Sequence, residues 1–125
     1  MIQNQKLNKY EKGWIEKILS VDFVYKEELI SQINRADIIR EYTDYYLIVK
    51  FVRIYPAKGC SEYTGVLLEM RAYLENRVPI QFLLHMEKGM ISELEVFKAD
   101  SSSINNVIDL ENVKIEILVD PKWKY

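Results

Sequence analysis

The alternation of apolar and polar residues in "GVLLEMRAYLENRVPIQFLLHMEKGMISELEVFKAD", residues 65–100, constrains the fold more than any other feature. Successive side chains of a strand point to opposite faces, so this pattern is typical of antiparallel strands with one face on the core and one in water. It predicts strands over 66–75, over 80–87 and from 90 onward, with a three-residue hairpin turn at 87–89 that uses the positive φ of Gly89. The predicted core face comprises Val66, Leu68, Met70, Ala72, Leu74, Ile80, Phe82, Leu84, Met86, Leu94 and Val96.

The opposite face of these strands is predicted to be polar and to carry the chain's one histidine, His85. An odd-numbered loop around 76–78 places Glu69 across from His85 on one side. On the other side, Glu93 lies opposite or diagonal to His85. We expect this register because a one-residue slip would bury the glutamates. The polar face then consists of Glu69, Arg71, Tyr73, Gln81, His85, Glu93 and Glu95.

Two carboxylates beside an imidazole have two interpretations. They form a weak metal or acid–base site, or they belong to a solvated sheet face whose opposite charges stabilise one another across strands. Metal sites usually require a closed set of ligands, and this segment holds one histidine and no cysteine pair. We therefore assign no metal ligand and favour the solvated face.

The rest of the chain predicts helices followed by further strands. Asn8 followed by Glu11 is typical of a capping box at the start of a helix, and apolar residues then recur at helical spacing. The remaining predicted elements are helices over 8–19 and 26–34, strands over 38–42, 45–55 and 113–119, and loops over 56–63 and 99–112. The prediction is an α+β fold: one domain over 1–125, with two N-terminal helices packed on an antiparallel meander sheet of five or six strands.

Composition limits the class of protein. A chain of 125 residues with 49% apolar and 29% charged side chains is long enough for one buried core. It holds no apolar run of the roughly 18 residues that span a bilayer, and its first residues lack the apolar centre of a signal peptide. Cys60 is the single cysteine, so no internal disulfide forms. We expect a cytoplasmic protein that does not enter the membrane.

The charge distribution and the motifs of the chain limit the partners and the chemistry that we expect. Residues 61–120 hold five basic and eleven acidic side chains, which disfavours nucleic-acid binding and accommodates a basic protein. No nucleophile–base pair and no Gly-rich phosphate loop is recognisable, so we assign no catalytic residue and no cofactor.

Residues 78–104, "VPIQFLLHMEKGMISELEVFKADSSSI", resemble a signature of small bacterial proteins of unknown function, found mainly in Gram-positive species. The matching residues are Val78, Pro79, Ile80, Leu83, Leu84, His85, Gly89, Ile91, Glu93, Leu94, Glu95, Phe97, Lys98 and Asp100. The resemblance covers about a fifth of the chain and implies a shared fold. Some small proteins of this sort accompany bacterial toxins as immunity proteins, so by analogy it also implies such a role.

Two functions remain open from the sequence. The first is a non-enzymatic protein-binding module, of the immunity type by the resemblance, whose acidic sheet face binds a basic toxin with Tyr73 as an anchor. The alternative is a small-ligand-binding protein or enzyme with a site around His85 and Glu93. An exposed edge strand also permits a homodimer. The candidate binding residues are Glu69, Arg71, Tyr73, His85, Glu93 and Glu95.

Overall fold

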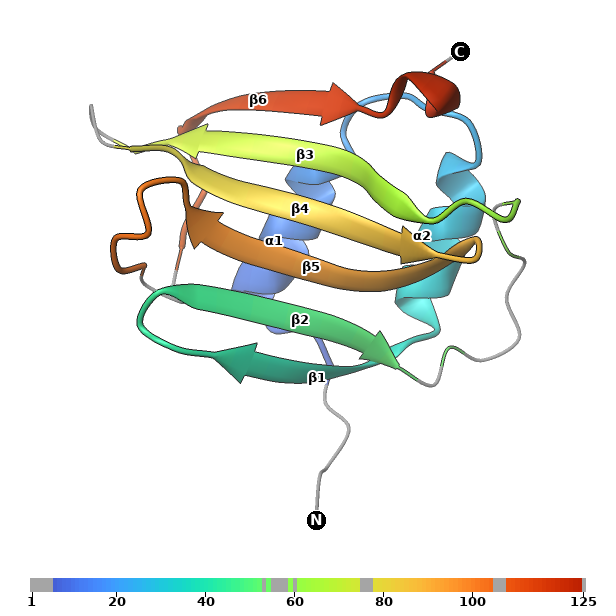
Figure 1. Cartoon of the computed structure of the whole chain (residues 1–125), viewed down its shortest axis with the longest axis horizontal. Coiled ribbons are helices and arrows are strands. Elements are labelled where there is room, and N and C mark those ends of the chain that lie inside the picture. Colours follow the sequence, from blue (N-terminus) through green and yellow to red (C-terminus); the bar gives the residue numbers. More distant parts are fainter. Residues whose placement is uncertain are drawn as a thin grey trace.

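The computed structural model describes residues 6–52, 54, 59, 61–74, 78–104 and 108–124. Two helices lie behind one sheet of six antiparallel strands (Figure 1), which confirms the predicted α+β fold. The elements are α1 (Lys9–Ile18), α2 (Lys26–Asn34), β1 (Asp37–Tyr42), β2 (Tyr46–Val52), β3 (Gly65–Tyr73), β4 (Ile80–Glu87), β5 (Met90–Lys98), β6 (Lys114–Val119) and the 3-10 helix η1 (Pro121–Trp123).

The strand order of the sheet is β1-β2-β5-β4-β3-β6. Strands β3, β4 and β5 form the predicted meander, with β4 and β5 at the centre. The β1–β2 hairpin joins it through β2, which pairs with β5, while β6 returns to pair with β3. Strands β1 and β6 are therefore the two edge strands of the sheet. A homodimer formed through one of these edges stays a prediction, which light scattering would test.

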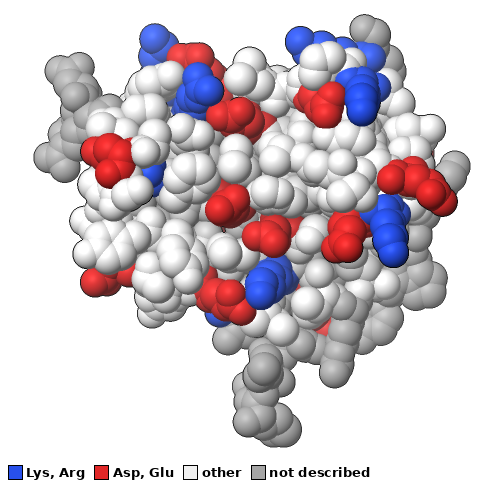
Figure 2. Space-filling view, viewed as in Figure 1, with Lys and Arg blue, Asp and Glu red and all other residues white. Residues whose placement is uncertain are grey.

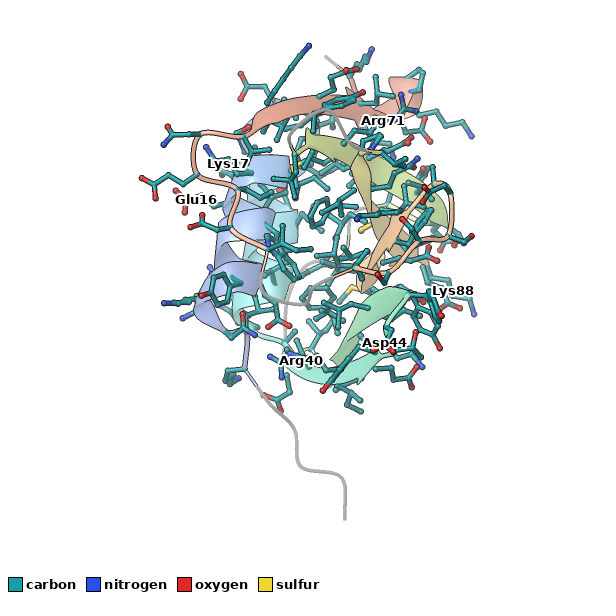
Figure 3. All side chains as sticks on the ribbon, turned by 90° about the vertical axis from the view of Figure 1, so that its left-hand side faces the viewer. Glu16, Lys17, Arg40, Asp44, Arg71 and Lys88 are labelled. Carbon is teal, nitrogen blue, oxygen red and sulfur yellow. The ribbon has the colours of Figure 1, made fainter. Side chains whose placement is uncertain are left out.

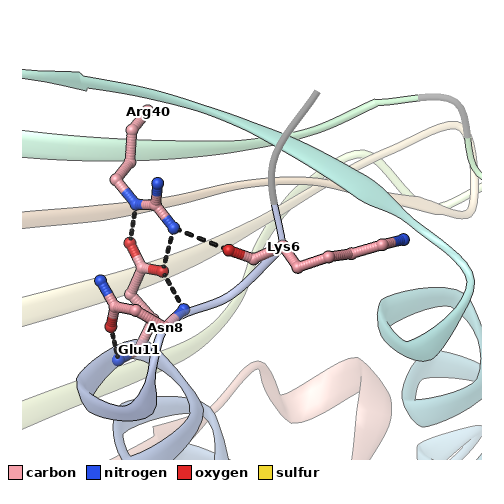
Figure 4. A network of polar contacts seen from close by, with 4 residues as sticks. All are labelled: Lys6, Asn8, Glu11 and Arg40. Atoms are coloured by element: carbon pink, nitrogen blue, oxygen red, sulfur yellow. Dashed lines mark hydrogen bonds and ion pairs between the residues drawn. The ribbon is translucent and has the colours of Figure 1, made fainter. Parts of the chain in front are cut away.

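The capping box predicted for α1 is present. The Asn8 side chain accepts a hydrogen bond from the Glu11 N–H at 2.9 Å, and Oε1 of Glu11 accepts one from the Asn8 N–H at 2.9 Å. Glu11 is also buried, and its carboxylate accepts hydrogen bonds from Nε and Nη2 of Arg40 on β1 (Figure 4). The Arg40 Nη2 also donates to the Lys6 carbonyl at 2.9 Å. The hydrogen bonds of Glu11 raise the pKa of Arg40. The Glu11 carboxylate thus caps α1 and also links it to β1 through Arg40.

The core lies between the helices and the sheet. The Trp14 ring packs on Phe82 with centroids 5.5 Å apart, and its indole N–H donates to the Ile108 carbonyl at 2.7 Å. Gln32 on α2 is buried; its side chain donates to the Gly89 carbonyl at 3.0 Å and accepts from the Ile91 N–H at 2.7 Å. These bonds hold the β4–β5 turn against α2 and satisfy polar groups that burial would otherwise leave unpaired.

Two predicted details of the strands are wrong. A β-bulge between Val66 and Leu68 shifts the register, so that Leu67 is fully buried whereas Val66 is 37% exposed, the reverse of the predicted faces. The β4–β5 turn has two residues between Glu87 and Met90 rather than three. Lys88 and Gly89 both have positive φ, as a type I′ turn requires. A separate bulge lies before the turn, where the β4–β5 register shifts between His85 and Met86.

Candidate functional site

The face of the sheet opposite the helices, here called the open face, carries all six candidate residues. Their positions follow from the strand pairing: they alternate with core residues such as Phe82 and Leu94. Figure 3 shows the two sides, with Glu16 and Lys17 on α1 and Arg71 on the sheet. The open face includes Ile39, Glu41, Tyr46, Ile48, Lys50, Val66, Glu69, Arg71, Tyr73, Gln81, Leu83, His85, Glu93, Glu95, Phe97, Lys114, Glu116 and Leu118.

Of the two carboxylates predicted to lie across from His85, one is found there and the other is not. Glu93 pairs with His85 across β4 and β5, as predicted. Glu69 pairs with Leu83 and not with His85, because the β3–β4 register differs by two residues from the predicted one, so the prediction for Glu69 is wrong. The residue across from His85 on β3 is Val66. The carboxylate that approaches the imidazole most closely is instead Glu95, whose Oε1 lies 2.9 Å from Nε2 of His85.

A second charged group lies at the border of β3 and β6. Nη2 of Arg71 donates to Oε1 of Glu69 at 3.2 Å, and the Glu69 charge raises the pKa of Arg71. A hydrogen bond with Glu116 raises the pKa of Tyr73, and the Lys114 ammonium lies 5.7 Å from the centre of the Tyr73 ring. Tyr73 is therefore engaged within the chain, which makes it a weaker anchor than the sequence predicts.

The open face is more mixed than the acidic surface predicted from the sequence. Figure 2 shows carboxylates spread over the central strands with uncharged surface between them and basic side chains beside several. Glu41, for example, binds the Lys50 ammonium at 3.0 Å, and this hydrogen bond raises the pKa of Lys50. The residues of the open face given above include five carboxylates and, besides His85, three basic side chains. The charge balance is negative, but several charges are paired internally.

The alternative function, a small-ligand site or an active site around His85 and Glu93, would require a pocket beside His85. A hollow of about 290 Å³ lies at the β3–β6 edge, and its lining includes Val66, Glu69 and Leu118. Two further hollows lie beside α2 and between α1 and residues 109–112. His85 lines none of these three. In the part of the chain that the structure describes, no three His, Cys, Asp or Glu side chains are placed to hold a metal ion.

Comparisons with protein-family models, with curated proteins and with solved structures gave no match. The resemblance of residues 78–104 to small bacterial proteins therefore stays a prediction. Among the described residues, no helix is long and apolar enough to cross a membrane. Cys60 and the loop residues 76 and 77 lie outside the described residues.

Proposed function

We propose that the chain is a non-enzymatic protein-binding module and that the open face is its docking surface. The observation that carries the proposal is the one-sided sheet: both helices cover one face (Figure 1), and the other presents charged side chains with uncharged surface between them (Figure 2). Leu118 is 51% exposed and Val66 is 37% exposed on that face. A face that exposes apolar side chains together with charged ones is typical of non-obligate protein interfaces.

The charge of the open face favours a basic partner. Its carboxylates outnumber its basic side chains, and complementary charge steers association even where it adds little to affinity. The finer form of the proposal is an immunity-type inhibitor that covers a basic toxin. Support for that form comes from the resemblance of residues 78–104 and from the acidic second half of the chain.

A photo-cross-linking amino acid placed on each side of the sheet tests the proposal. We expect the group at Gln81, on the open face, to give a discrete cross-linked product with another protein in the cells from which the chain comes. The matched control is the same group at Lys17 on the helix side (Figure 3), which should not give that product. The product should also disappear when Glu93 and Glu95 are both changed to lysine, because a basic partner is then repelled.

Two results would count against the proposal. The same products from both positions would show non-specific collision rather than docking. A product from Gln81 that survives the double charge reversal unchanged would exclude a partner selected by charge.

A further inference from the structure

The turn of the β1–β2 hairpin carries an unusual concentration of exposed aromatic rings. Three of the six large apolar side chains exposed among the described residues lie within five positions: Tyr42 is 62% exposed, Tyr45 58% and Tyr46 40%. Single exposed apolar residues are normal in a folded protein, whereas a group of exposed large rings indicates a binding surface. Tyrosine is also among the residues that carry most of the binding energy at interfaces.

The strand pairing separates these tyrosines by face. Tyr46 pairs with Phe97 on the open face. Tyr42 pairs with Leu47, a buried residue, so it lies on the opposite side of the hairpin. Tyr45 lies in the turn between them. Tyr46 is therefore continuous with the proposed docking surface, and Tyr45 is the exposed turn residue next to it in the sequence. These two residues are called the tyrosine pair below.

The backbone holds the tyrosine pair in place. Oγ1 of Thr43 accepts hydrogen bonds from the N–H groups of Tyr45 at 3.1 Å and Tyr46 at 3.3 Å, and the Thr43 N–H donates to the Tyr46 carbonyl at 2.9 Å. The loop after β5 also contacts this turn, because the Ile104 N–H donates a hydrogen bond to the Asp44 carbonyl at 2.8 Å. A surface that is already ordered loses little conformational entropy when a partner binds.

Negative charge lies beside the tyrosine pair. Asp44, in the same turn, is exposed (Figure 3), whereas the half-exposed side chain of Glu41 at the end of β1 already pairs with Lys50. Figure 2 shows a broad uncharged area where β2 begins and β5 ends, with carboxylates at its borders. An aromatic surface bordered by carboxylates complements a cation that is also planar. The guanidinium of arginine has that shape: it stacks on aromatic rings and binds carboxylates, whereas the compact lysine ammonium is more strongly hydrated.

We infer that the tyrosine pair is the anchor for an arginine-containing segment of the partner protein, with an arginine side chain stacked on the exposed rings and bound by Asp44. This inference rests on the proposed protein-binding function and refines it. It replaces Tyr73 as the anchor and names the residue type that the partner supplies.

The probe for this inference is a nine-residue peptide of alternating arginine and glycine, with lysine–glycine and glutamate–glycine peptides for comparison. Each is titrated at low salt into the full chain labelled with ¹⁵N, and amide shifts are followed by NMR. We expect saturable shifts at residues 41–47 and 100–104, tighter binding of the arginine peptide than of the lysine peptide, and no binding of the glutamate peptide. Changing both residues of the tyrosine pair to serine should weaken binding of the arginine peptide about five- to thirtyfold, because two stacking contacts are lost.

Two variants keep the experiment specific. Tyr42→Ser removes the most exposed tyrosine of the same hairpin but from its other side, so it should change the dissociation constant by less than about twofold. Replacing the tyrosine pair with phenylalanine keeps the rings and should preserve most of the binding. An unchanged urea midpoint for the double serine variant shows that any loss of binding is not a loss of folding.

Two outcomes would overturn the inference. One is the absence of saturable shifts with the arginine peptide. The other is a set of shifts confined to the centre of the open face around His85, with equal affinity in the serine variant. Neither would overturn the proposed function, because cross-linking from Gln81 can still succeed. Conversely, failed cross-linking together with peptide binding at the turn would overturn the docking function and leave an arginine-binding turn.

Discussion

The buried ion pair between α1 and β1 gives the most direct test of how this fold is held together, and Glu11→Gln is the change that isolates it. The Glu11 side chain is 1% exposed, and its oxygens accept three hydrogen bonds, two from Arg40 and one from the Asn8 N–H. Glutamine has nearly the same shape and still accepts the capping bond. It carries no charge, however, and it presents an NH₂ group where the guanidinium needs an acceptor.

Removing one member of a buried ion pair typically costs 3–5 kcal/mol. Arg40 keeps its bond to the Lys6 carbonyl, and its side chain is 21% exposed, so we expect the lower end, about 3 kcal/mol. With a urea m-value of about 1.5–2 kcal/mol/M, that loss lowers the unfolding midpoint by about 1.5–2 M. Urea unfolding followed by circular dichroism measures the shift, and the m-value should stay constant.

The matched control is Glu41→Gln, which removes the carboxylate partner of Lys50. The two side chains of that pair are 50% and 43% exposed, and exposed ion pairs contribute little to stability, so the midpoint should hardly move. Equal shifts in the two variants, or a loss below about 1 kcal/mol for Glu11→Gln, would show that water reaches the Glu11–Arg40 pair and would refute the reasoning.

Three further predictions concern the β4–β5 turn and the C-terminal segment. Gln32→Leu leaves the Ile91 N–H and the Gly89 carbonyl buried without their partner and should cost about 2–4 kcal/mol in urea unfolding. Gly89→Ala places a Cβ at a φ of 79° and should cost about 1–2 kcal/mol in the same assay. The hydroxyl of Tyr63 holds the pKa of Asp120 below its ordinary 3.8, so the stability this carboxylate contributes is present above that value and is lost as the pH falls through the lowered native pKa. Asp120→Asn should therefore lower the melting temperature at pH 7 and make less difference near pH 2; an equal difference at both pH values would contradict this.

Local sequence patterns predicted the elements because each depends on nearby residues. The Asn8–Glu11 capping box defines where α1 begins, and the alternation over 80–87 identifies the buried side of β4. The register across β3 and β4 could not be predicted in the same way. Alternation fixes only which residues share a face, and it is satisfied equally by pairings that differ by two residues. Glu69 therefore lies opposite Leu83 although its face was predicted correctly.

Contacts between distant segments explain the rest. Leucine and valine are equally apolar, so nothing in the residues marks the bulge that exchanges Val66 and Leu67. The bond from Arg40 to Glu11 joins residues 29 positions apart and needs the packing of α1 on β1 to be known first. Tyr45 and Tyr46 read as strand residues typical of a core, and only the position of the turn shows that they are exposed.

The placement of the β4–β5 hairpin has a consequence for how the chain folds. The two middle strands of the sheet come from one continuous stretch, Ile80–Lys98, joined by a two-residue turn, so they can meet at a small entropic cost of loop closure. Strand β3 lies next to β4 both in the sequence and in the sheet and extends this ribbon to three strands. The strands that join its two sides are more distant in sequence: β2 reaches β5 from more than forty residues upstream, and β6 returns to β3 from a similar distance downstream. A locally formed ribbon therefore offers both of its edges as templates, and we expect the two later additions at its flanks to be the slow steps of folding.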